Sequence, residues 1–214
     1  MTIHNAALVP DSITLKNNGH EVAYFLNFPY GQQVTLTGGP LLNQTYILHN
    51  FHMHWPSEHL LNGVLYNAEM HMVFYKSNYR RLKNAINNQD GVAVLAFFYE
   101  VESTFKRFNH IFDALNDVLY AGSTGHITKN ITSLNEIIGT EPFAVYSYPG
   151  SLTTPNCREV VTWMVCNRTI PMSLVESFEL RQLRFKDKAR VLRNNRPIQP
   201  TNGREIVRYD SILN

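Results

Sequence analysis

The chain has 214 residues, 44% of them hydrophobic, which is enough for one sizeable globular domain with its own core. Its net charge is only +2, from 19 basic and 17 acidic residues, and no basic run reaches four residues, so nucleic acid is not an expected partner. The longest apolar run, Val92 to Tyr99, is far shorter than the ~20 residues that a membrane-spanning helix needs.

The first two thirds of the chain are predicted to form mainly strands. The expected strands are rich in β-branched and aromatic residues and are separated by turns that contain Asn, Gly or Pro. They cover Ser12–Lys16, Glu21–Phe28, Gln33–Thr37, Tyr46–Trp55, Val64–Tyr75 and Gly91–Val101. The stretch Val92–Phe98 is almost wholly apolar, which predicts a central strand buried on both faces.

Helices are expected only after this region. Apolar residues recur at three- and four-residue spacing from Phe105 to Leu119, and Gly122 follows as a stop signal, which predicts a helix. Ser133-Leu-Asn-Glu136 and Ser173-Leu-Val-Glu176 have the form of capping boxes, each opening a short helix, the first ending at Gly139.

The remaining segments add two strands and allow a fold class to be predicted. Two more strands are predicted at Phe143–Tyr148 and Glu159–Val165, followed by a mostly irregular tail with Arg196-Pro197 and Gln199-Pro200. No internal repeat or linker is visible. We therefore predict a mainly β (α+β) fold: a single domain over residues 1–214, with one large, mostly antiparallel twisted sheet and a few surface helices.

Three histidines fall on two neighbouring predicted strands. His52 and His54 are two positions apart, so they point to the same strand face, and an antiparallel neighbour would bring His71 close to them. Three imidazoles suit a catalytic zinc, because the fourth tetrahedral position stays open for water. A histidine on a strand is more often a plain core or surface residue, but Asn50 and Glu69 each lie two residues before a candidate ligand and could hold its outer nitrogen. We therefore favour a metal site over plain core or surface histidines.

Longer motifs around these histidines resemble the α-class carbonic anhydrases. The blocks follow the family's order from about Ile13 to the tail. They are Asn17-Asn18-Gly19-His20, Gly38-Gly39-Pro40-Leu41, Phe51-His52-Met53-His54-Trp55, Ser57-Glu58-His59, Tyr66-Asn67-Ala68-Glu69-Met70-His71-Met72-Val73, Asp90-Gly91-Val92-Ala93-Val94-Leu95, Tyr148-Pro149-Gly150-Ser151-Leu152-Thr153-Thr154-Pro155 and Val161-Thr162-Trp163.

The resemblance implies a zinc lyase that reversibly hydrates carbon dioxide to bicarbonate and a proton, with a role in pH regulation. It implies a ten-stranded sheet with Zn²⁺ at the base of a conical cleft, held by His52, His54 and His71. Carbonic anhydrase is also the reference case for a zinc-bound water whose pKa falls to ~7. The expected partner is the small-molecule substrate alone, and the expected state is a monomer.

The resemblance also implies roles for residues around the zinc. Thr153 matches the gatekeeper that accepts a hydrogen bond from the zinc-bound hydroxide, and Glu58 matches the carboxylate that orients that threonine. Thr154 lines the same cleft. His20 matches the histidine that carries the proton to solvent, for which an unperturbed pKa of ~6.5 is suited. The family's apolar pocket for carbon dioxide corresponds in this sequence to Val73, Val94, Leu152, Val161 and Trp163.

The sequence departs from the family pattern in three places. The family's N-terminal segment before the first block is not seen, the loop between Trp55 and Ser57 is short, and Ala23 replaces a polar cleft residue of many members. These departures keep alternatives open: a catalytically weak or silent carbonic-anhydrase-like binding module, a zinc esterase, or a shortened product that folds poorly.

The two cysteines give information on the cellular location of the protein. Cys157 and Cys166 flank a predicted strand and would lie roughly 30 Å apart, too far for a disulfide, so both thiols are expected to be free. Secreted members of the family carry a cysteine where Cys157 lies, with a partner in the N-terminal segment. Together with three Asn-x-Ser/Thr sequons, this favours a secreted, extracellular type, with a cytoplasmic location as the alternative.

Overall fold

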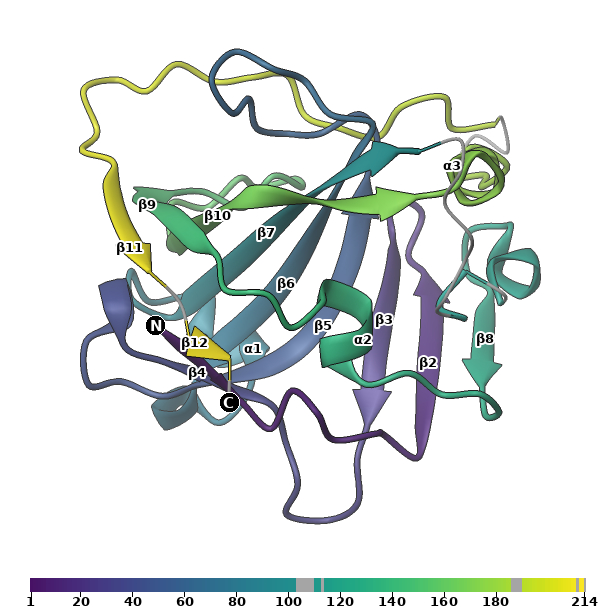
Figure 1. Cartoon of the computed structure of the whole chain (residues 1–214), viewed down its shortest axis with the longest axis horizontal. Helices are drawn as coiled ribbons and strands as arrows, with labels where there is room; N and C mark the ends of the chain where they lie inside the picture. Colours follow the sequence, from purple (N-terminus) through teal and green to yellow (C-terminus); the bar gives the residue numbers. More distant parts are fainter. Residues whose placement is uncertain (103–109, 113, 186–189, 211, 214) are drawn as a thin grey trace.

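In a computed structural model, the described residues of the chain (1–102, 110–112, 114–185, 190–210 and 212–213) contain one large sheet (Figure 1). Its main strand order is β11-β9-β10-β7-β6-β5-β3-β2-β8, and β1, β4 and β12 pair beside this path. The strands are β1 Thr2–His4, β2 Ser12–Asn17, β3 Val22–Asn27, β4 Thr35–Thr37, β5 Tyr46–His54, β6 Ala68–Lys76, β7 Val92–Val101, β8 Thr124–Ile127, β9 Ala144–Gly150, β10 Val161–Met172, β11 Val207–Asp210 and β12 Ile212–Leu213.

The helices are few and short, and the 3₁₀-helices are labelled η. They are η1 Gly39–Leu41, η2 Ser77–Tyr79, α1 Leu82–Ala85, η3 Leu115–Val118, α2 Leu134–Ile138 and α3 Leu174–Leu180.

Most strand neighbours are antiparallel, while β10 with β7 and β1 with β12 are parallel. The predicted fold class, mainly β with a large sheet and a few helices, is thus confirmed. No described helix is long and apolar enough to cross a membrane.

Strand β7 lies inside the sheet, between β10 and β6, and is buried on both faces, as its apolar sequence predicts. Ala93, Leu95 and Phe97 belong to the main core on one face, whereas Val94 and Phe98 belong to a smaller apolar cluster on the other. Successive side chains of a strand point to opposite faces, so this division follows directly from the period of two. The smaller cluster lies on the sheet face that also carries the histidines.

Two capping boxes form as predicted. The Ser133 backbone N–H donates to Glu136 Oε2 at 2.7 Å, and the Ser173 backbone N–H donates to Glu176 Oε2 at 2.7 Å. Each serine hydroxyl in turn accepts from the backbone N–H of its glutamate. These reciprocal bonds satisfy donors that a helix start otherwise leaves unpaired, and they open α2 and α3.

The predicted helix from Phe105 to Leu119 is not found in the described residues. Phe105 and Phe108 lie outside them, and residues 110–112 and 114–119 form turns and η3 instead. Asn17 on β2 holds this region from the side, because its Nδ2 donates to the Val118 carbonyl at 2.9 Å. Apolar spacing alone did not reveal that tertiary contact.

Strand boundaries also differ from the prediction. β6 begins at Ala68 rather than Val64, because Leu61 and Val64 pair across a tight turn in which Asn62 and Gly63 have positive φ. β10 continues to Met172, well beyond the predicted end. The short strands β1, β8, β11 and β12 were not predicted, since two to four residues are too few to show a period.

Candidate metal centre

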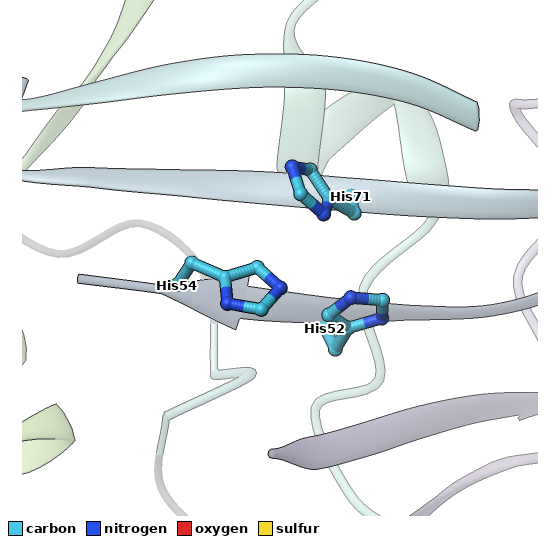
Figure 2. Close-up of side chains that lie close together, drawn as sticks. All are labelled: His52, His54 and His71. Carbon is cyan, nitrogen blue, oxygen red and sulfur yellow. The ribbon is translucent and has the colours of Figure 1, made fainter. Parts of the chain in front are cut away.

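The central strands bring the three predicted ligands together. β5 and β6 pair antiparallel with His52 directly opposite His71, and His54 lies opposite Glu69. Phe51 and Met53 of β5 belong to the main core, so His52 and His54 point to the opposite face. Figure 2 shows the three rings around a common space. One ligand nitrogen from each lies within 4.8 Å of the others, and all three side chains are buried.

Two of the rings are held by their outer nitrogens. His71 Nε2 donates to Glu69 Oε1 at 2.6 Å, which leaves Nδ1 toward the other rings. His54 Nδ1 lies 3.3 Å from the Asn194 carbonyl, which leaves His54 Nε2 buried without a hydrogen-bond partner. A protein acceptor on the outer nitrogen fixes ring orientation and tautomer, which is the usual support of a metal-binding histidine.

Glu69, itself fully buried, is the centre of a hydrogen-bond network. Its Oε1 also accepts from His59 Nδ1 at 2.6 Å, while Oε2 accepts from the backbone N–H groups of Glu58 and His59 at 2.9 and 2.8 Å. His59 Nε2 lies 2.5 Å from the Tyr148 hydroxyl, which donates to it, since Nδ1 carries the ring proton. The network ties β6, the loop after Trp55 and β9 to one carboxylate.

Burial and this carboxylate set the charges of the cluster. Burial lowers the pKa of His54 to about 4 against the opposing effect of Glu58, and burial with His71 lowers that of His52 well below its usual range. Burial alone would also lower the pKa of His71, but Glu69 outweighs it and raises that pKa. Burial opposes the charge of Glu69 as well, yet His59 and His71 hold its pKa well below the usual range. Two of the three imidazoles are thus neutral, as metal ligands must be.

Unpartnered buried atoms gather at this centre. Across the described residues, eight buried side-chain polar atoms have no hydrogen-bond partner, and five of them are Glu21 Oε2, Asn50 Oδ1, His52 Nδ1, His54 Nε2 and Glu58 Oε2. A buried polar atom without a partner is costly, so such a group points to an ion or water that completes the site. Three histidine nitrogens around one space fit Zn²⁺.

The predicted substrate pocket lies beside the histidines. Val73, Val94, Val161 and Trp163 are buried in the smaller apolar cluster, and the half-buried Leu152 packs against it. The Trp163 ring centre is 4.7 Å from that of His71 and 4.8 Å from that of His59, so this apolar wall borders the cluster.

Thr153 and Glu58 lie on the same cleft without bonding to each other. The cleft has a volume of about 600 Å³ and is lined also by His59, Tyr148 and Trp163. Glu58 Oε1 accepts from the Arg196 backbone N–H at 2.6 Å, while Oε2 has no hydrogen-bond partner. Glu58 also lies 3.4 Å from His54 Nδ1. The hydrogen bond expected from Thr153 to Glu58 is therefore not formed between these two described residues.

The remaining predicted residues are placed as follows. His20 is exposed in the Asn-Gly turn before β3, and its backbone N–H donates to Asn18 Oδ1 at 2.9 Å. Thr154 is half-buried beside Thr153. Asn50 is buried on the face of His52, but its Oδ1 makes no hydrogen bond to that ring or to any other described group. Cys157 and Cys166 are both free, as predicted.

Four contacts of the site were missed by sequence reasoning. His59 bonds to Glu69, the Tyr148 hydroxyl bonds to His59, and the Asn194 carbonyl lies beside His54. Glu21 Oε2 lies 3.2 Å from His52 Nε2. The motif Ser57-Glu58-His59 carried a signal for His59, because a buried carboxylate needs donors beyond one histidine. Asn194 carried no local signal, since 140 residues separate it from His54.

Comparison with known proteins agrees with this geometry. The profile of the family described as eukaryotic-type carbonic anhydrase matches residues 1–210. Carbonic anhydrase 1 of Oryctolagus cuniculus is 31% identical, over 95% of this chain and 92% of that protein. Carbonic anhydrase 3 of Sus scrofa is 32% identical, over 89% of the chain and 75% of that protein. Carbonic anhydrase 6 of Bos taurus is 31% identical, over 90% of the chain and 61% of that protein. The chain belongs to the eukaryotic-type carbonic anhydrase family.

Proposed function

We propose that the chain is a zinc lyase that reversibly hydrates carbon dioxide to bicarbonate and a proton. The observation that carries the proposal is the buried cluster of His52, His54 and His71. Protein acceptors hold the outer nitrogens of His54 and His71, while His52 Nδ1 and His54 Nε2 are buried without a hydrogen-bond partner. Zinc at such a site supplies a nucleophile at neutral pH by lowering the pKa of a bound water to ~7.

The surrounding residues fit a small, uncharged substrate. Val73, Val94, Val161 and Trp163 offer an apolar wall that holds carbon dioxide without competing hydrogen bonds and keeps bulk water away. Thr153 on the cleft would orient the attacking water with its hydroxyl. Glu58 Oε2, which has no hydrogen-bond partner, would then accept a hydrogen bond from the Thr153 hydroxyl.

The missing Thr153–Glu58 bond favours a second candidate, a catalytically weak or silent carbonic-anhydrase-like binding module. One experiment separates the two: carbon dioxide hydration and zinc content measured on the same purified sample. Hydration with one zinc per chain supports the enzyme, and full zinc with no hydration supports the binding module. Secretion, a role in pH regulation and the monomeric state stay predictions.

Thr153→Ala should keep its zinc and lose about 10²-fold in hydration rate. The change leaves the three histidines untouched and removes one hydrogen-bonding group that positions the reacting water, and such a group contributes on this scale. Stopped-flow hydration with metal analysis checks this result. Thr124→Ala is a matched control, because Thr124 is exposed on the edge strand β8. A wild-type rate in Thr153→Ala would show that the threonine has no part in the reaction.

His20→Ala should slow turnover only when proton transfer limits it. The exposed imidazole lies outside the cluster and can exchange protons with solvent. We expect a reduced rate in dilute buffer and recovery when imidazole is added as a soluble proton carrier. His126→Ala, which removes another exposed histidine, on β8, is the control. An equal loss at every buffer concentration would contradict a shuttle role.

A further inference from the structure

The cleft beside the metal centre extends outward, away from the histidines. Its inner end carries Thr153 and Trp163, whereas the three histidines of the metal centre are not among the described residues that line it. Tyr148 pairs with Trp163, and Tyr146 pairs with Val165, across β9 and β10, so these side chains line the cleft from one face of the sheet. The volume of about 600 Å³ is typical of a site for a small organic molecule.

The outer walls of the cleft are apolar and partly exposed. Leu60 and Leu61 belong to the loop after Trp55, and Ile198 and Ile206 belong to the segment that precedes β11. Figure 1 shows the two segments side by side. Leu60, Ile198 and Ile206 are 44%, 46% and 52% exposed. Large apolar side chains gathered at the mouth of a cleft are typical of a ligand site, because a bound ligand removes them from water.

Two arginines bring positive charge to this cleft. Arg204 Nη1 donates to the Pro149 carbonyl at 3.3 Å, and Arg196 Nη1 donates to the Ser151 hydroxyl at 3.1 Å, so both guanidinium groups approach the C-terminal end of β9. The Arg204 guanidinium also lies over the Tyr148 ring, 5.0 Å from its centre, which fixes the plane of the group. The positive charge is thus held at a defined place beside the apolar walls.

This positive charge has no anionic partner in the described part of the chain. The Arg204 guanidinium donates to three carbonyl oxygens and that of Arg196 to one hydroxyl oxygen, and neither forms an ion pair with a described carboxylate. A guanidinium carries more N–H groups than these contacts use. Glu58 is the one acidic residue among the described residues that line the cleft, and its carboxylate lies beside His54. The unused N–H groups are suited to a carboxylate from outside the chain.

We propose that the outer cleft is a second binding site, which takes a small aromatic carboxylate. The carboxylate pairs with the guanidinium of Arg204 at the end of β9, and the ring packs on Tyr146 between the walls that carry Leu60 and Ile206. An aromatic body suits a cleft lined by tyrosine rings, because aromatic pairs are favourable beyond the area that they bury. The site is separate from the three histidines, so binding requires no metal.

The test is isothermal titration calorimetry of the metal-free and the zinc-loaded chain with 4-phenylbutyrate and with its neutral amide, 4-phenylbutanamide. The acid should bind about 10- to 100-fold more tightly than the amide, because only the acid forms charge-assisted hydrogen bonds. Arg204→Gln should remove most of this preference, and Arg204→Lys should keep only part of it, since a lysine lacks the planar fork. Ile206→Ser should weaken both ligands alike. Arg208→Gln and Leu174→Ser are matched controls, because both residues are exposed and neither is among the described residues that line the cleft.

The outcomes separate this site from the proposed function. Equal affinity for the acid and the amide, or no saturable binding of the acid at millimolar concentration, would overturn the proposal. Binding of the acid to the zinc-loaded chain alone would also overturn it, since the anion would then sit on the metal. Wild-type preference for the acid in Arg204→Gln would place the carboxylate elsewhere; should that variant fail to fold, wild-type preference in Arg204→Lys would do so. Binding of the acid by a chain that does not hydrate carbon dioxide would remove the proposed function and leave this site.

Discussion

His54→Ala should abolish both zinc retention and carbon dioxide hydration. Two imidazoles cannot complete the coordination that a catalytic zinc requires, and the ring that is lost belongs to a buried site. Metal analysis after dialysis should find wild-type protein with one zinc per chain and the variant with essentially none. The hydration rate of the variant should not exceed that of buffer alone.

His49→Ala is the matched control for this change. His49 lies on the same strand, but its ring packs edge-on against Phe25 and Tyr75, away from the cluster. Its removal should leave zinc content and hydration close to wild type. One zinc per chain and full activity in His54→Ala would instead refute the metal assignment, whatever the result for His49→Ala.

The sequence predicts the centre of this site because its geometry is local. Alternation along one strand puts His52 and His54 on one face, and pairing with the next strand brings in His71. Glu69 could be found by the same rule, since it lies two residues before His71. The resemblance to a family added residues, such as Thr153 and Trp163, that no period can connect to the histidines.

Contacts between distant parts of the chain could not be predicted in this way. The Asn194 carbonyl reaches His54 from a segment without regular structure, whose path depends on the packing of the whole domain. The same limit explains the error at η3, where apolar spacing typical of an α-helix occurs in a segment that Asn17 holds to β2. The proximity of Glu21 to His52 was overlooked for a different reason: a polar neighbour of His52 was sought two residues away on its own strand.

Glu69→Gln should destabilise the metal-free protein by about 2–4 kcal/mol, because removing one partner of a buried charged network leaves the others unpaired. The carboxylate accepts four hydrogen bonds in the described structure, two from the rings of His59 and His71 and two from backbone N–H groups. An amide has one acceptor oxygen, and its NH₂ group would face donors. Urea denaturation at neutral pH, fitted to a two-state transition, measures the change.

The control is Glu100→Gln, an exposed carboxylate near the end of β7, where the free energy of unfolding should change by no more than about 0.5 kcal/mol. In a chain of this size, the loss in Glu69→Gln corresponds to a fall in Tm of roughly 5–15 °C. The variant should also bind zinc about 10- to 100-fold more weakly, since His71 loses the acceptor on its Nε2. Equal stability of the Glu69→Gln and Glu100→Gln variants would mean that the buried network contributes nothing to folding, and His71 would then need another source of its orientation.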